Sequence, residues 1–150
     1  MPKLTESTAG AYLDRFAKVA PDAKPLWGKM TGAQMLGHVT LVLKYSMGQG
    51  QPMPFRGTFM MQYIVGPIMM TGLVKFPKNV PLPKKKGSPP ITWPDGDMES
   101  LRAALDEFLT SANDGSMFVM HHPYFGNIGV NGWRKFHAAH FDHHLRQFGA

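Results

Sequence analysis

Cysteine is absent from the 150-residue sequence. The chain can therefore form no disulfide, no iron–sulfur cluster and no thiolate zinc site, and it has no cysteine nucleophile. Any metal ion would need histidine or carboxylate ligands. The first residues, MPKLTESTAGAYLDRF, lack the apolar stretch and small-residue cleavage site of a secretory signal, so we expect a cytoplasmic protein.

Acidic residues are in the minority. The chain has 10 Asp and Glu and 16 Lys and Arg, which gives a net charge of +6. Much of the excess lies in PLPKKKGSPP, where Lys84, Lys85 and Lys86 are surrounded by prolines. That setting favours a solvated loop over a phosphate-binding patch. Since no aromatic residues alternate with the basic ones in a nucleic-acid-binding pattern, we expect neither nucleic acid nor a membrane as a partner.

The sequence also lacks an uninterrupted hydrophobic run of membrane-spanning length. Residues 58–74, TFMMQYIVGPIMMTGLV, are almost entirely apolar, but they contain Gln62 and are broken at Gly66 and Pro67. At about 17 residues the run is also shorter than a typical membrane span. We expect a buried or lid-like insert. Its methionines suit an adaptable surface, which leaves a homodimer or another protein partner open.

Helical periodicity dominates the rest of the chain, and strand-like alternation is scarce. Apolar residues recur at helical spacing over 5–20, over 31–47, over 97–112 and from near residue 131 to the end. Thr31 with Gln34 predicts a capping box, and Asp97 predicts an N-cap. The sequence therefore predicts an all-α four-helix bundle in one domain, 1–150, with an apolar insert and a long proline-rich crossover between helices 2 and 3.

Histidines are concentrated near the end of the chain, in HAAHFDHHLRQFGA. A rotation of 100° per residue places His137, His140 and His144 on the broad aromatic face of the last helix, with His143 near its edge and solvated. The remaining members of that face are Trp133, Phe136, Phe141, Gln147 and Phe148. The opposite face holds Arg134, Lys135, Ala138, Asp142 and Arg146. We expect the aromatic face to be buried.

His38 lies in the middle of the predicted inward stripe of the second helix, with Thr31, Gln34, Met35, Leu41, Val42 and Tyr45. Buried imidazoles need partners for their nitrogens, and a metal ion supplies one to several at once. His140 and His144 are one turn apart and can bind the same ion. His38 would complete three neutral ligands and leave a coordination position open. A hydrogen-bonded core histidine remains the alternative for His38 alone.

Carboxylates are missing from the predicted buried faces, which argues against a di-iron centre and favours a mononuclear site. Zn²⁺ and Ni²⁺ are the favoured divalent metals, with Fe²⁺, Mn²⁺ and Cu²⁺ left open. Imidazole ligands leave the two positive charges of the ion uncompensated, so an anionic ligand such as a thiolate would bind well. His137 and His144 are roughly 10 Å apart along the axis, so we expect His137 to support a ligand or face the substrate.

Two motifs, WGKMTGAQMLGHV and HPYFGNIGVNGWRKFHAAHFDHHLRQFG, resemble the DinB/YfiT-like superfamily, and specifically a DinB-related branch catalogued as a domain of unknown function. The resemblance covers most of the chain and is weakest in the insert and the crossover. It implies a four-helix bundle with a long connection between the second and third helices. It also implies a divalent metal on His38, His140 and His144. Characterised superfamily members include thiol-dependent S-transferases and a thiol-dependent isomerase.

These observations predict a mononuclear metal-dependent enzyme, a thiol-dependent S-transferase or a hydrolase, acting on a small molecule with a low-molecular-weight thiol as candidate co-substrate. His137, Tyr45 or Gln147 would orient the nucleophile or move a proton. For His122, a proton shuttle, a substrate contact and a loop hydrogen-bonder are all open. The alternative function is a non-catalytic helical bundle that binds a small ligand or a protein.

Overall fold

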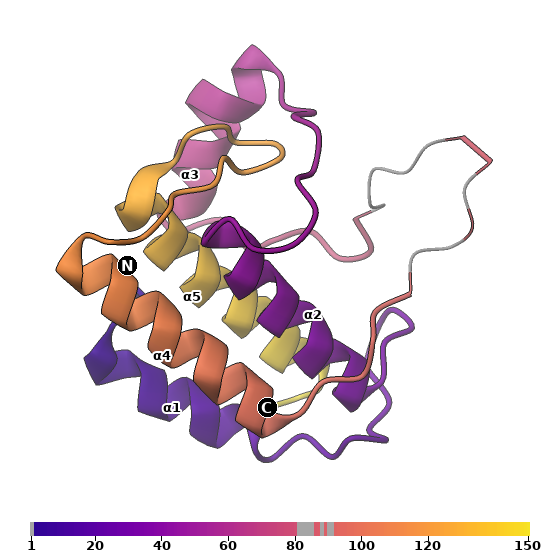
Figure 1. The fold of residues 1–150 in the computed structure, drawn as a ribbon. Helices are drawn as coiled ribbons and strands as arrows, with labels where there is room; N and C mark the ends of the chain where they lie inside the picture. Colours follow the sequence, from indigo (N-terminus) through magenta and orange to yellow (C-terminus); the bar gives the residue numbers. More distant parts are fainter. Residues whose placement is uncertain (1, 81–85, 88, 90–91) are drawn as a thin grey trace.

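The structure is a computed structural model that describes residues 2–80, 86, 87, 89 and 92–150. Its secondary structure in those residues is helical, with no strand, which confirms the all-α prediction (Figure 1). A single antiparallel bridge joins His122 to Gly126. The elements are α1 (Glu6–Phe16), α2 (Gly32–Ser46), the π-helix η1 (Met61–Val65), α3 (Gly66–Met70), α4 (Met98–Asp114) and α5 (Gly129–Gln147).

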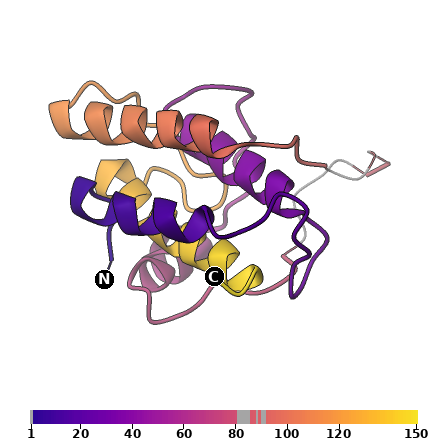
Figure 2. The same cartoon turned by 90° about the horizontal axis from the view of Figure 1, so that it is seen from below.

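The four long helices form a ring of contacts around one core. Helix α1 packs on α4 and α5, and α2 packs on the same two helices from the other side (Figure 2). Each helix therefore buries two adjoining strips of its surface. The largest fully buried side chains come from all four helices and include Phe16, Met35, Leu43, Leu105, Phe108, Trp133 and Phe141.

The predicted helix starts are confirmed at atomic detail. The Thr31 side chain accepts a hydrogen bond from the Gln34 backbone N–H at 3.2 Å, and the Gln34 side chain accepts one from the Thr31 N–H at 3.1 Å. Asp97 accepts a hydrogen bond from the Ser100 N–H at 2.7 Å. Such caps satisfy N–H groups that the first helical turn leaves without partners, so these boundaries follow from local sequence.

Two residues assigned from helical projection lie on the other side of their helices. Ala138 was predicted to face outward but is fully buried, because α1 covers this side of α5. Leu41 was predicted to face inward but is 40% exposed, whereas Val39 and Leu43 are fully buried. Helix α2 packs on both α4 and α5, and Leu41 lies on the side of α2 that neither helix covers.

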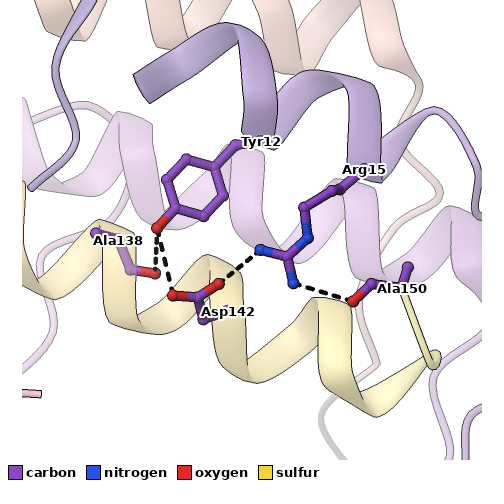
Figure 3. Close-up of polar contacts among 5 residues, drawn as sticks. All are labelled: Tyr12, Arg15, Ala138, Asp142 and Ala150. Carbon is purple, nitrogen blue, oxygen red and sulfur yellow. Dashed lines mark hydrogen bonds and ion pairs between the residues drawn. The ribbon is translucent and has the colours of Figure 1, made fainter. Parts of the chain in front are cut away.

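A polar contact fixes α1 against α5 (Figure 3). The Arg15 guanidinium lies 2.7 Å from the Asp142 carboxylate and also donates a hydrogen bond to the Ala150 carbonyl at 3.0 Å. The Tyr12 hydroxyl donates to the same carboxylate at 3.3 Å. Burial first, and the Asp142 charge second, raise the pKa of Tyr12 to about 12. The buried phenol is therefore held in its neutral form.

This raised pKa predicts a loss of stability at alkaline pH. Above pH 10 the Tyr12 hydroxyl ionises in the unfolded chain but not yet in the folded one, so its contribution to stability falls between pH 10 and about 12. We expect the difference in unfolding free energy between wild type and Tyr12→Phe to shrink by about 2 kcal/mol across this window. Urea unfolding at a series of pH values measures it, and a constant difference would contradict the assignment.

Of the two predicted alternatives for the insert, buried or lid-like, the exposed side chains contradict the first. Gly66 and Pro67 do not break the helical run, because the π-helix η1 passes directly into α3. A π turn tolerates a missing backbone N–H, which is what proline brings. Gly66 and Met70 face α5 and are buried, whereas Phe59 and Leu73 are exposed. No helix in the described parts of the chain is long and apolar enough to cross a membrane.

The proline-rich crossover joins α3 to α4, and its described residues contain no helix, as predicted. Of the basic cluster, Lys86 is exposed. Lys84 and Lys85 lie outside the described residues, so the predicted solvated loop stays a prediction there. Near the two ends of the crossover, Phe76 lies against His143 and Trp93 lies against His38.

Candidate metal centre

Three buried histidines from α2 and α5 converge on one point. The Nε2 atom of His140 lies 2.9 Å from Nε2 of His38 and 3.0 Å from Nε2 of His144. The three candidate ligand atoms all lie within 4.8 Å of one another. Two nitrogens bound at 2.0–2.1 Å to one ion are separated by about 2.9–3.4 Å at ordinary bond angles. The predicted three histidines therefore come together, and they could hold a metal ion.

The geometry follows from helix spacing and from the packing of α2 on α5. His140 and His144 are one turn apart, so their rings project from the same side of α5. His38 reaches them from the first half of α2, which packs on α5. The ring centroids of the three imidazoles lie 4.6 to 4.9 Å apart in edge-to-face arrangements. Edge-to-face rings allow the Nε2 atoms to approach without the rings stacking.

Gln147 determines the hydrogen position on His144. Its Nε2 atom donates a hydrogen bond to the Trp27 carbonyl at 2.8 Å, so its Oε1 atom faces Nδ1 of His144, also at 2.8 Å. An amide oxygen accepts only, and therefore Nδ1 of His144 carries the hydrogen. The lone pair of a neutral His144 is then on Nε2, where a ligand needs it.

Gly28 permits this arrangement. It adopts a positive φ of 80°, and a Cβ at this position would lie 2.7 Å from Nε2 of Gln147. The Leu26 backbone N–H also donates to the Gln147 carbonyl at 2.7 Å. The Trp27–Gly28 pair in the first motif therefore brings a turn against the C-terminal end of α5 and orients the His144 ring.

Hydrogen bonds alone do not satisfy the three rings. The lone pair on Nε2 of His144 points toward Nε2 of His140. If Nε2 of His140 carries a hydrogen, that hydrogen can satisfy only one of its two short contacts, to His38 or to His144. If it carries none, its lone pair faces that of His144 at 3.0 Å. Among the described residues, Nδ1 of His38 and Nδ1 of His140 have no partner. A cation among the three Nε2 atoms removes the conflict, so the donor set fits a metal ion.

The three histidines are in the neutral, ligating form near pH 7. Burial lowers the pKa of His38 and His140 well below 6.5, and neighbouring histidines lower both further. Burial also lowers the pKa of His144 to about 4, against an opposing effect of the Gln147 hydrogen bond. In the described part of the chain no Asp or Glu side chain is buried, so the candidate ligands are imidazoles only.

Aromatic residues surround the three histidines. The Trp93 ring lies 4.3 Å from His38 and the Phe136 ring 5.3 Å from His140, centroid to centroid. Half-buried His143, predicted to be solvated, packs beside Phe76 at 6.0 Å and Trp27 at 5.9 Å. Trp93 was not predicted as part of the site, since it lies in the irregular crossover, where no periodicity indicates which way a side chain points.

His137 and Tyr45 make their hydrogen bonds away from the three converging Nε2 atoms. Ser46 Oγ donates to the Leu43 carbonyl at 2.6 Å, so it accepts from Nε2 of fully buried His137 at 3.0 Å. The Tyr45 hydroxyl donates to the His121 carbonyl at 3.1 Å. Of the residues predicted to assist chemistry, Gln147 is the one hydrogen-bonded to a candidate ligand.

His122 organises the loop before α5. Its Nδ1 atom accepts hydrogen bonds from the backbone N–H groups of Tyr124 and Phe125 at 3.2 and 3.1 Å. Its ring stacks on Phe125 at 4.5 Å and packs edge-on against Phe136 at 4.6 Å. Of the three predicted alternatives, these contacts favour the loop hydrogen-bonder. Burial lowers the pKa of His122 to about 3, which keeps it a neutral acceptor.

The contact between Gln147 and His144 yields a prediction about metal affinity. Replacing Gln147 with alanine removes the acceptor that fixes the His144 tautomer, and we expect the Kd for Zn²⁺ to rise about 10–100-fold. Competition with a chromogenic chelator measures the change. The matched control is Gln49→Ala, which removes an amide bonded to Glu107 on the surface. Equal affinity in wild type and Gln147→Ala would contradict the orienting role.

Comparison with known proteins gives one family. Residues 7–150 match the family described as a protein of unknown function, DUF1569. No curated protein and no solved structure matches the chain. Because the match extends over nearly the whole sequence, from the first turn of α1 to the last residue, the chain belongs to the DUF1569 family.

Proposed function

We propose that the protein is a mononuclear, divalent-metal-dependent enzyme with His38, His140 and His144 as the metal ligands. The observation that carries this proposal is the convergence of three buried Nε2 atoms, with contacts of 2.9 and 3.0 Å. Burying three imidazoles against one another is costly without a common partner. A metal ion bound by all three Nε2 atoms would offset this cost.

We further propose that the chain is one domain of the DinB-like four-helix type. Two features support this assignment: the ring of contacts among α1, α2, α4 and α5 and the long connection between α2 and α4. The motif positions support it too, because Trp27, Gly28 and Gln147 lie together around His144. The cytoplasmic location stays a prediction.

Zn²⁺ and Ni²⁺ are the proposed metals, with Fe²⁺, Mn²⁺ and Cu²⁺ as alternatives. Neutral imidazole nitrogens suit all of these ions, and the absence of a carboxylate from the candidate ligand group disfavours Mg²⁺ and Ca²⁺. Three protein ligands also match the pattern of catalytic rather than structural zinc sites, which keep a position for water or substrate.

The proposed reaction is thiol-dependent S-transfer or hydrolysis of a small molecule. A divalent ion with neutral ligands supplies Lewis acidity and lowers the pKa of a bound water or thiol. The chain contributes the orientation of His144 through Gln147, and Trp93 and Phe136 shield the site from water. No buried carboxylate among the described residues is available as a general base, which favours a nucleophile that is already anionic, such as a thiolate.

Assays with small thiols and electrophiles test the proposal. Protein loaded with Zn²⁺ or Ni²⁺ should consume a thiol and an electrophile, or hydrolyse an activated ester, and chelation should abolish the activity. Apo His140→Ala protein returned to the same metal should stay inactive. Metal-loaded wild-type protein that bound thiols but turned over no electrophile or ester would favour a non-catalytic binding protein instead.

A further inference from the structure

The insert exposes apolar side chains on the side that does not pack on the helical core. Phe59 is 74% exposed, Tyr63 65% and Leu73 87%. With Met60, Ile64 and Ile68, which are also exposed, they form what we call the insert face. In Figure 1 the insert stands to one side of the four long helices, beside the start of α5. So large an exposed apolar surface is typical of an interaction site.

The helical spacing explains why these side chains share one face. Exposed residues recur every four positions through the π-helix and α3, as the pairs 59/60, 63/64 and 67/68, so they project from one side. The opposite side of α3 contacts α5, and there Gly66 lies against the Phe125 ring. The insert is therefore apolar on both sides, but only one of them packs on another part of the chain among the described residues.

The charged residues that flank the insert in the sequence are all basic. Residues 57–74 contain no charged side chain, while Arg56 precedes them and Lys75 and Lys78 follow. Over a longer range, residues 23–94 hold nine Lys and Arg and no Asp or Glu. The remaining residues hold seven basic and ten acidic ones. The positive charge of the protein is thus concentrated in the half of the sequence that carries the insert.

We propose that the insert face docks on the surface of an anionic lipid membrane, with its apolar side chains among the acyl chains and Arg56 and Lys75 among the headgroups. A helix that lies in the interface needs an apolar face, and basic residues near an anionic leaflet add affinity. Tyr63 suits this depth because it has an apolar ring and a polar tip. The sequence-based expectation of no membrane partner rested on the short, interrupted apolar run and on the solvated lysine loop. Neither reason applies to a helix that lies in the membrane interface and does not span it.

A second copy of the chain is a poorer occupant of this surface. In a two-fold symmetric pair the same patch contacts itself, so the basic border of one copy would lie close to the equally basic border of the other. Like charges at the border of an apolar contact oppose association, and no acidic residue between positions 23 and 94 is available to compensate them. An anionic membrane can accommodate both the apolar insert face and the basic residues that flank it.

Co-sedimentation with vesicles tests this proposal, using the full chain. We expect binding to vesicles of phosphatidylcholine with phosphatidylglycerol, weaker binding at high salt, and little binding to pure phosphatidylcholine. Phe59→Ser/Tyr63→Ser should weaken binding about tenfold or more by removing apolar contact. Arg56→Gln/Lys75→Gln should weaken it about 30-fold, since each basic residue near an anionic leaflet contributes about fivefold.

Matched controls are Leu26→Ser and Lys18→Gln, which change exposed residues outside the insert and should bind like wild type. Absence of binding to anionic vesicles would overturn the proposal, as would equal binding to neutral vesicles or no effect of the insert variants. Light scattering during size-exclusion chromatography provides a further readout. A dimer that Phe59→Ser/Tyr63→Ser dissociates, together with no vesicle binding, would assign the insert face to a second copy instead.

Discussion

Replacing His140 with alanine should abolish measurable binding of Zn²⁺ and Ni²⁺, because the Nε2 atom of His140 is the one within 3.0 Å of both other candidate ligands. Loss of an outer partner of a ligand costs roughly 10–100-fold in affinity, and loss of a ligand itself should cost more. Thermal unfolding provides a second readout. Metal at one hundred times its Kd should stabilise wild type by about 2.7 kcal/mol and leave His140→Ala unchanged.

His143→Ala is the matched control for this experiment. His143 lies on the same helix, next to His144, but it is half-buried and does not belong to the three converging histidines. Its replacement should leave the metal stoichiometry intact. Circular dichroism of apo His140→Ala should show an unchanged helical content, because alanine favours helix and removes an unsatisfied polar atom. Full metal binding by a folded His140→Ala protein would disprove the assignment.

Replacing Gly37 with alanine should destabilise both the fold and the candidate metal centre. A Cβ on Gly37 would lie 1.9 Å from the Pro94 carbonyl oxygen, which is backbone and cannot rotate away. Forcing this extra atom into the packing of α2 against the segment before α4 should cost about 3 kcal/mol. Because His38 follows Gly37 and packs against Trp93, we also expect weaker binding of Zn²⁺.

Gly10→Ala provides the opposite result at another helical glycine. Gly10 lies in the middle of α1, and a Cβ there meets nothing within 4 Å. The substitution should therefore stabilise the protein by up to about 1 kcal/mol through helix propensity. Urea unfolding of both variants and of wild type measures the contrast. Equal unfolding free energies for Gly37→Ala and wild type would show that the close approach of α2 and Pro94 is not a constraint.

Local sequence rules predicted the helices and the candidate ligands because those features depend on spacing within one element. Capping at Thr31 and Asp97 requires only residues three positions away. The pairing of His140 with His144 follows from the pitch of one helix. The inclusion of His38 depends on which helices are neighbours, which spacing within one helix does not specify, and the packing of α2 on α5 agrees with the prediction.

Features that depend on contacts between elements were not predictable in the same way. The burial of Ala138 and the exposure of Leu41 depend on which neighbours cover α5 and α2. Trp93 and the Trp27 carbonyl reach the histidines from irregular segments, where side-chain direction has no period. The buried alternative for the insert is wrong, because the four long helices already fill the core and leave much of the insert exposed.

Metal content per chain tests the central claim most directly. Untagged protein, with His38→Ala, His140→Ala and His144→Ala beside it, should be dialysed against Zn²⁺ or Ni²⁺ and then analysed by plasma mass spectrometry. The three converging Nε2 atoms predict one tightly bound ion per chain in wild type and none in any of the three variants. Wild-type protein that took up neither ion would make these histidines members of the core and leave the proposed enzyme without its metal.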